Sequence, residues 1–187
     1  MPTSHTVGVI VGSLRKDSFN RKIAHAAVAV APPTLSLKFI EIGDLPLYNA
    51  DLETAQPPAA WAAFRQALHG VDAVLFVTPE YNRSLPGVLK NAIDVGSRPA
   101  GKSSWSGKPC AVISVTQGAL GAIAANLALR ASFVFLNMPV MQQPEAYIGG
   151  AATLFDDKGE LTSATTRDFL VKFMDAFGKF VARQLAP

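Results

Sequence analysis

The sequence predicts an α/β fold, a doubly wound sheet of five parallel strands with helices on both faces. Short β-branched apolar runs alternate with longer segments whose apolar residues recur at helical spacing, and the connections between them are short. The composition is that of a folded globular protein, because 49% of the 187 residues are hydrophobic and 17% are charged. No linker, repeat or low-complexity segment divides the chain, so residues 1–187 are expected to form a single domain.

The first predicted strand and helix are each followed by residues that end such elements. Thr6–Val11 is a short apolar run ended by Gly12, as expected of a strand that is buried on both faces. Phe19–Ala31 has the alanine content and the apolar spacing of a helix, which the prolines at positions 32 and 33 would end. Leu35–Ile42 then predicts a second strand. The chain therefore opens as strand, helix, strand.

The same pattern repeats through the rest of the chain. A helix is expected at Pro57–His69, which is rich in alanine and has an aromatic face, and a buried strand at Ala73–Thr78. Pro86–Gly96 predicts the next helix, because proline suits a first helical turn. The remaining expected elements are a strand at Cys110–Thr116, a helix from about Gly121 to Leu136, a weaker strand at Pro139–Ile148 and an amphipathic helix at Thr165–Leu185.

Five such strands fit the flavodoxin-like order, in which ligands bind beyond the carboxyl ends of the strands. The loops expected at that edge are Gly12–Ser18, Pro79–Leu85 and Thr116–Leu120. We therefore expect the functional residues in these three loops.

The loop after the first strand contains the groups that bind a phosphate. Ser13 and Ser18 can donate hydroxyl protons, Arg15 can donate charge-assisted hydrogen bonds, and Asn20 can donate through its amide. The first backbone N–H groups of the following helix are unpaired and favour an anion. An ordinary helix with Ser18 as its N-cap is the alternative, but a cap requires neither Ser13 nor Arg15.

Two nucleotide-binding motifs are not supported. The dinucleotide fingerprint requires three glycines at G-x-G-x-x-G, whereas Gly8 and Gly12 stand four residues apart without a third. Gly96–Ser103 reads GSRPAGKS and matches the P-loop expression. A helix is expected before it and a strand after it, which reverses the P-loop context. We interpret this stretch as an exposed helix-to-strand connection.

The loop after the third strand places an aromatic residue among polar groups. It begins with Pro79, Glu80, Tyr81 and Asn82, at the edge where a doubly wound sheet binds its ligand. A flat heteroaromatic ring would suit the Tyr81 side chain, and exposed backbone N–H groups could bind the carbonyls and nitrogens of that ring. A proline-rich turn with a half-buried tyrosine is the alternative interpretation.

Charge, cysteine and histidine content argue against several functions. The net charge is only +3, which does not by itself indicate a nucleic-acid partner. Cys110 is the only cysteine, so no internal disulfide can form, and its apolar surroundings predict a buried thiol. His5, His25 and His69 lack the spacing of metal ligands. With no signal-like or membrane-spanning segment, we expect a cytoplasmic protein without metal, nucleic-acid or membrane partners.

Two motifs, GSLRKDSFN and PEYNRSLPGVLKNAID, together resemble the NADPH-dependent FMN reductase family, and in particular its bacterial chromate and quinone reductase branch. The resemblance extends from the first strand to about Glu145 and implies a flavodoxin-like fold with noncovalently bound FMN. By position, it assigns the FMN phosphate to Ser13, Arg15, Ser18 and Asn20, the border of the isoalloxazine ring to Pro79, Glu80, Tyr81 and Asn82, and further ring contacts to Thr116, Gln117 and Gly118.

The resemblance also implies an activity. Electrons would pass from NADPH or NADH through FMN to a small-molecule acceptor, which could be a quinone, an azo compound, a flavin or an oxidised metal ion such as chromate. No side chain is assigned as a catalytic acid or base, and for Glu80 we expect a helix-side hydrogen bond or a contact between subunits. A homodimer is expected, with a homotetramer as a less secure alternative.

Two rival functions are retained. A flavodoxin-type electron carrier would bind FMN without substrate turnover, although such carriers are usually strongly acidic, unlike this chain with its net charge of +3. A flavin-free regulatory or scaffold domain would not bind FMN at all.

Overall fold

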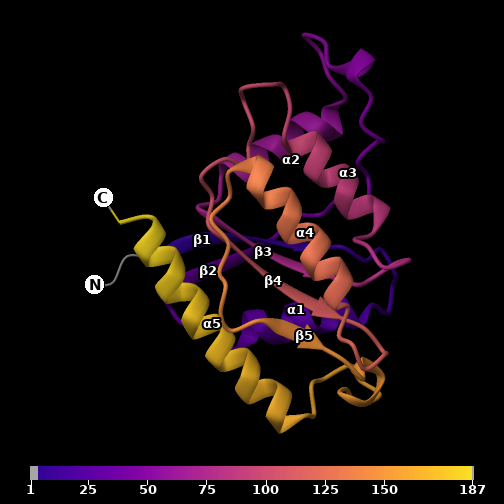
Figure 1. Cartoon of the computed structure of the whole chain (residues 1–187), viewed down its shortest axis with the longest axis vertical. Coiled ribbons are helices and arrows are strands. Elements are labelled where there is room, and N and C mark those ends of the chain that lie inside the picture. Colours follow the sequence, from indigo (N-terminus) through magenta and orange to yellow (C-terminus); the bar gives the residue numbers. More distant parts are fainter. Residues whose placement is uncertain (1–3, 187) are drawn as a thin grey trace.

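The computed structural model describes residues 4–186 and contains a five-stranded sheet in the order β2-β1-β3-β4-β5 (Figure 1). All neighbouring strands are parallel, and the order is flavodoxin-like, so the predicted fold class is confirmed. The strands are β1 (His5–Val11), β2 (Leu35–Phe39), β3 (Ala73–Thr78), β4 (Cys110–Val115) and β5 (Ala146–Ile148). The helices are α1 (Phe19–Ala29), α2 (Ala59–His69), α3 (Gly87–Gly96), α4 (Ile123–Leu136) and α5 (Ala164–Gln184), with short 3₁₀ turns η1 (Ala50–Leu52) and η2 (Ala151–Thr153).

The strand register brings three strand ends together. Val11 of β1 pairs with Val77 of β3, and Thr78 of β3 pairs with Ser114 of β4. Every residue of β3 and β4 is buried, as their uninterrupted apolar runs predicted. Because parallel strands all end at the same edge, the loops after β1, β3 and β4 leave the sheet side by side.

Two layers of helices cover the sheet. Helices α1 and α5 pack on one face through residues such as Ile23 and Phe177. Helices α2, α3 and α4 pack on the other face through Phe64, Leu89 and Phe133. Figure 1 shows these layers on either side of the strands. Each helix turns its apolar stripe toward the sheet, which is why the helical spacing was readable in the sequence.

The fifth strand is shorter than predicted. It spans only Ala146–Ile148, whereas Pro139–Ile148 was expected, and Val140 contributes just one isolated bridge to Cys110. Gln142 and Gln143 between them are exposed, and the following proline has no N–H to donate to a ladder. The second strand also ends early, at Phe39 rather than Ile42, although the Ile42 side chain remains in the core.

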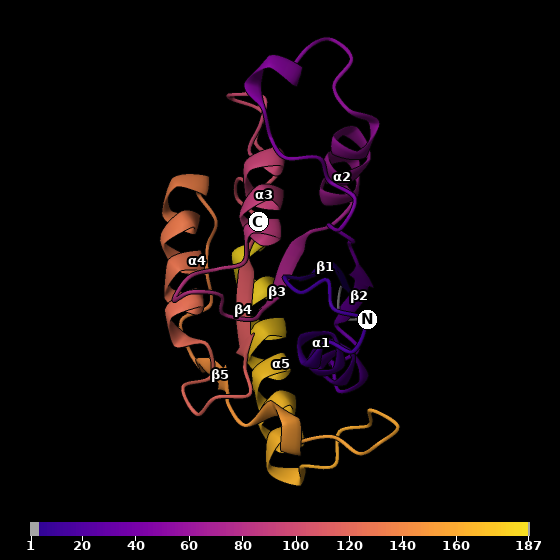
Figure 2. The ribbon, with the colours of Figure 1, turned by 90° about the vertical axis from the view of Figure 1, so that its right-hand side faces the viewer.

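A buried ion pair anchors the long connection between β2 and α2, which Figure 2 shows projecting beyond α2 and α3. The Arg65 guanidinium binds both carboxylate oxygens of Glu53, at 2.8 and 2.6 Å. Its Nε also donates to the Val95 carbonyl at 2.9 Å, and the group lies 5.7 Å from the centre of the Trp61 ring. Arg65 therefore joins the connection, α2 and the end of α3 at one point.

We expect Arg65→Ala to lower the free energy of unfolding by about 3–5 kcal/mol, because it leaves the largely buried Glu53 carboxylate without a partner. Urea denaturation of the wild type and the variant measures this loss. Lys90→Ala is the matched control, since it removes the exposed ion pair with Asp94 and should cost less than about 1 kcal/mol. Equal losses in the two variants would contradict the proposed anchoring role.

Candidate functional site

A cleft of about 230 Å³ opens where the loops after β1, β3 and β4 meet. All the residues predicted to bind the cofactor line it except Asn82 and Gly118. Phe19 and Val115 line it as well and were not predicted. The lining consists of Ser13, Arg15, Ser18, Phe19, Asn20, Pro79, Glu80, Tyr81, Val115, Thr116 and Gln117. The three loops singled out in the sequence thus form one concave surface.

One end of the cleft is rich in hydrogen-bond donors at the start of α1. Ser18 is the N-cap, and its hydroxyl accepts the Arg21 backbone N–H at 3.3 Å, so the cap interpretation is correct for this residue. A capping hydroxyl still has its own proton to donate. Ser13, which the cap does not use, is also buried against the cleft. The cap therefore accounts for only part of the loop.

Arg15 is the cationic side chain that lines this end of the cleft. Its neighbours on α1 are engaged elsewhere: Arg21 binds both oxygens of Glu41, and the Lys22 ammonium lies 5.5 Å from the centre of the Phe155 ring. Hydrogen bonding from Arg21 also holds the pKa of Glu41 below its usual range. Arg15 is exposed and has no carboxylate within 4.0 Å among residues 4–186.

Asn20 carries a buried polar atom without a partner. Its Nδ2 donates to the Val115 carbonyl at 3.4 Å, whereas its Oδ1 is buried and makes no hydrogen bond in the described part of the chain. A buried oxygen without a hydrogen bond destabilises the folded protein unless a ligand or a water molecule donates one to it. The donors of Ser13, Arg15 and Ser18 suit a phosphate monoester, and the Asn20 Oδ1 suits a hydroxyl of the attached chain. The residues present therefore fit flavin mononucleotide, which has both groups.

The loop after β3, which was predicted to border the flavin ring and is called the ring-side loop below, contains a tight two-residue hairpin. Tyr81 and Ser84 exchange backbone hydrogen bonds of 3.0 Å each, and Asn82 and Arg83 between them have φ of 52° and 63°. Both turn residues are left-handed, a conformation in which asparagine is favoured among non-glycine residues. Asn82 thus shapes the turn and lies outside the cleft lining, while Tyr81 is half exposed at its rim. The turn predicted as an alternative for this stretch is present, and it presents the tyrosine to the cleft.

Glu80 makes the helix-side hydrogen bonds expected of it. Its Oε2 accepts the backbone N–H groups of Ala124 and Ala125, at 3.0 and 3.2 Å, at the start of α4. Its Oε1 lies 3.6 Å from Nη1 of the exposed Arg83. The carboxylate is therefore committed to the protein rather than free in the cleft.

The loop after β4 is fixed by backbone contacts with the turn after β5. The Thr116 carbonyl accepts from Ala151 at 3.1 Å, and the Gly118 carbonyl accepts from Gly150 at 3.3 Å. A Cβ atom on Gly149 would lie 2.7 Å from the Ala119 carbonyl oxygen, so only glycine fits there. Thr116 and Gln117 reach the cleft, whereas Gly118 serves this packing and lies outside the lining.

Sequence reasoning missed a buried polar network beneath that loop. Ser114 Oγ donates to the Gly121 carbonyl at 2.7 Å and accepts from Asn126 Nδ2 at 3.2 Å. Arg130 continues the network, donating to Asn126 Oδ1 at 2.8 Å and to the Met141 carbonyl at 3.1 Å. Ser114 and Asn126 are completely buried. A serine in an otherwise apolar strand, followed by an asparagine in an alanine-rich helix, was the available signal.

The alternative sites considered in the sequence gain no support. Gly96 ends α3, and the GSRPAGKS stretch leads from that helix to β4, which confirms the helix-to-strand connection. Cys110 is buried, and burial raises the pKa of its thiol well above the usual range. Among residues 4–186 there is no group of three or more histidine, cysteine, aspartate or glutamate side chains placed to hold a metal. In the same part of the chain, no helix combines the length and hydropathy needed to cross a bilayer.

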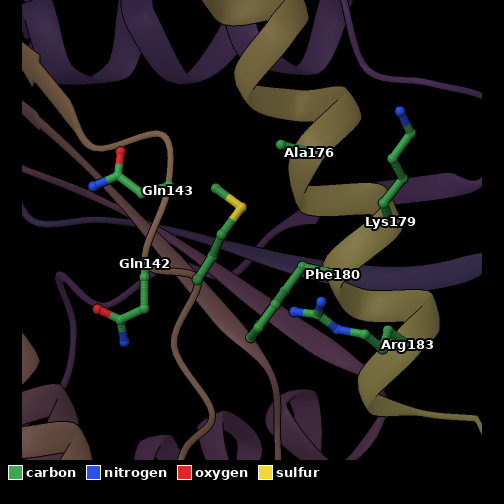
Figure 3. A pocket seen from close by; sticks show the side chains of 7 residues that line it. Gln142, Gln143, Ala176, Lys179, Phe180 and Arg183 are labelled. Atoms are coloured by element: carbon green, nitrogen blue, oxygen red, sulfur yellow. The ribbon is translucent and has the colours of Figure 1, made fainter.

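Cavity size does not identify the site. A roomier cavity of about 420 Å³ lies between α5 and the segment before β5, bordered by Met141, Phe180 and Arg183 (Figure 3). Its polar side chains are all exposed, and no residue of the two sequence motifs lines it. The smaller cleft brings together buried hydroxyls, an unpartnered buried amide oxygen and a free cation, so the chemistry favours it.

Comparison with known proteins agrees with this geometry. The model of a family described as NADPH-dependent FMN reductase matches residues 5–153. The chain belongs to this family. The reductase is 61% identical over 181 residues to a quinone reductase of Pseudomonas putida, with 97% of each chain covered.

Two further proteins are similar to the reductase over nearly its whole length. It is 46% identical over 175 residues to a 2-hydroxy-1,4-benzoquinone reductase of a Burkholderia species, covering 94% of this chain and 95% of the relative. Among solved structures it is similar to FerB, a flavoenzyme NAD(P)H:(acceptor) oxidoreductase from Paracoccus denitrificans, with a TM-score of 0.90, 42% identity and coverage of 96% and 98%. The resemblance carried by the two motifs is thus confirmed, and with it an oxidoreductase that uses FMN and a nicotinamide donor.

We expect Asn126→Ala to lower the free energy of unfolding of the reductase by about 1–3 kcal/mol, because it removes a hydrogen-bond partner from both Ser114 and Arg130 inside the protein. Thermal or urea unfolding measures this. Gln184→Ala, at the exposed end of α5, is the control and should leave stability within about 0.5 kcal/mol of wild type. A variant at position 126 as stable as this control would show that the network does not hold the loop after β4.

Proposed function

We propose that the reductase transfers electrons from NADPH or NADH through FMN to quinones. The observation that carries the proposal is the cleft itself, which has phosphate donors at one end and the Tyr81 hairpin at the other. The names of the relatives support a quinone as acceptor, since two of them are called quinone and benzoquinone reductases. Azo compounds, free flavins and chromate stay predictions as further acceptors.

The side chains have separate roles in this proposal. Ser13, Arg15, Ser18 and Asn20 would hold the FMN phosphate and the chain attached to it. Pro79, Glu80 and Tyr81 would border one side of the ring, and Thr116 with Gln117 the other. Bound FMN supplies the redox chemistry, and the protein supplies binding, orientation and electrostatics. The half-exposed Tyr81 leaves room at the rim, so nicotinamide and acceptor would use the same opening in turn.

Steady-state turnover tests the proposal against its rivals. The FMN-loaded protein is mixed with NADPH and a benzoquinone, and NADPH oxidation is followed by absorbance, with the reaction lacking quinone as control. The proposal requires sustained oxidation that depends on the quinone. A protein that binds FMN but does not turn over would be an electron carrier, and one that stays colourless after incubation with FMN would be a flavin-free domain.

We expect Arg15→Ala to weaken FMN binding by about 1.5–3 kcal/mol, because the phosphate loses a charge-assisted hydrogen bond. Fluorescence titration of FMN into the apoprotein measures the change. Lys102→Ala, which removes the lysine of the P-loop-like stretch, is the matched control and should bind FMN as tightly as wild type. Unchanged affinity in the Arg15 variant, or a large loss in the control, would refute this placement of the phosphate.

We propose further that the reductase is a cytoplasmic homodimer in which α4 packs against its counterpart. The outward face of α4 is apolar, and Val134 and Phe135 are 85% and 84% exposed. Arg130 is the only charged residue of this helix, and it points inward to Asn126 and the Met141 carbonyl. An exposed apolar helix face of this kind is typical of a protein–protein interface.

Phe135→Asp should therefore convert a dimer into a monomer, because a carboxylate cannot be buried in an apolar interface without a partner. Sedimentation equilibrium of both proteins measures the mass. Val171→Asp, which places the same charge on α5, is the control and should remain dimeric. A wild type that is monomeric at all concentrations, or a Phe135 variant that stays dimeric, would contradict the proposed dimer through α4.

A further inference from the structure

Helix α4 lacks a cap of its own. The N-cap residue, Ala122, has φ of 60° and no side chain that can accept a hydrogen bond, and the first turn contains no acidic residue. The unpaired N–H groups of a first helical turn need acceptors, and the positive end of the helix dipole favours a negative charge. Both requirements are met from a distant part of the sequence, by Glu80 in the loop after β3.

The Glu80 carboxylate is well placed for this task. Its Oε2 accepts from the N–H groups of Ala124 and Ala125, at 3.0 and 3.2 Å, and the side chain is only 15% exposed. The other charged contact, to Arg83, spans 3.6 Å and its arginine is 74% exposed, so it contributes little. The hydrogen bonds to α4 are therefore the main side-chain attachment of Glu80.

The attachment of Glu80 to α4 affects the cleft because the residues on either side of Glu80 in the sequence line it. Pro79 and Tyr81 on either side of it both line the cleft. The hairpin that follows is closed by its own backbone pair between Tyr81 and Ser84, which shapes the loop but does not tie it to the rest of the protein. The hydrogen bonds between Glu80 and α4 attach the loop to a helix that packs on the sheet.

We propose that Glu80 is a positioning residue, which holds the ring-side loop in place by capping α4. The inference rests on the proposed function only for its effect on FMN, because the cap itself exists without the cofactor. The carboxylate is needed as a charged acceptor at the helix end and does not serve as a proton donor. Loop position, and with it FMN affinity, depends on the Glu80 side chain, whereas the pH dependence of turnover does not.

The experiment compares Glu80→Ala, Glu80→Gln and Glu80→Asp with Glu160→Gln, an exposed glutamate on a remote turn. Amide hydrogen exchange of the apoprotein reports the cap directly. We expect Glu80→Ala to speed exchange at Ala124 and Ala125 about tenfold or more and to weaken FMN binding by a similar factor, the scale of a lost hydrogen bond to a charged group. Glu80→Gln keeps an acceptor oxygen and should lie between wild type and Glu80→Ala. Glu80→Asp keeps the charge on a shorter side chain and should resemble Glu80→Ala.

The pH profile of kcat separates positioning from proton transfer. Glu80→Gln should retain the wild-type profile, because its amide can position the loop but cannot donate a proton from a carboxyl group. Loss of one limb of that profile in Glu80→Gln would overturn the proposal, and so would unchanged amide exchange at Ala124 and Ala125 in Glu80→Ala. The exchange measurement needs no flavin, so a wild type that fails to bind FMN would refute the proposed function while the cap is still tested.

Discussion

The site depends on the parallel pairing of β1, β3 and β4. Parallel strands deliver all their carboxyl ends to one edge, and the register sets Val11 beside Val77 and Thr78 beside Ser114. Three loops spread over more than a hundred residues of sequence therefore begin within one or two strand spacings of each other. A strand slipped by two residues would keep the same face of the sheet buried but would move its loop out of the cleft.

The second constraint is that the polar groups beneath the loop after β4 and at the start of α4 are paired inside the protein rather than by solvent. Ser114, Asn126 and Arg130 join β4, α4 and the segment before β5, and Glu80 joins the ring-side loop to the same helix. Helix α4 is thus hydrogen-bonded to other elements at its first turn and at its middle. This arrangement explains how one helix can shape the cleft on its inner side while its outer side stays apolar.

Much of the fold and the cleft could be predicted from the sequence, because the signals were local. The buried runs of β1, β3 and β4 and the spacing of α1 are periodic patterns, and the loop after β1 is one short segment. The contacts that were missed or left without a partner join residues far apart in the sequence. For Glu80 the sequence predicted a helix-side hydrogen bond but not the partner, and for Asn126 it identified no contact, because these pairs span 44 and 12 positions and form only once the sheet is assembled. The length of β5 was overestimated because apolar residues such as Val140 and Met141 suit a core as well as a strand.

The roles of Asn82 and Gly118 illustrate the same limit. Both stand in loops that were expected to bind the cofactor, yet one sets a left-handed turn and the other packs backbone against backbone. A motif records every residue that a loop requires, including those that shape the loop from outside the cleft lining.

The close packing around Gly149 bears on how the enzyme could be altered. Because the turn after β5 leaves no space for even one methyl group at Gly149, the backbone support of Thr116 and Gln117 tolerates no larger residue there. Leu120, on the loop after β4, is 60% exposed and is not packed in this way. Attempts to redirect the enzyme toward bulkier oxidants would therefore do best to vary exposed residues of the loops around the cleft and to leave the turn at Gly149 unchanged.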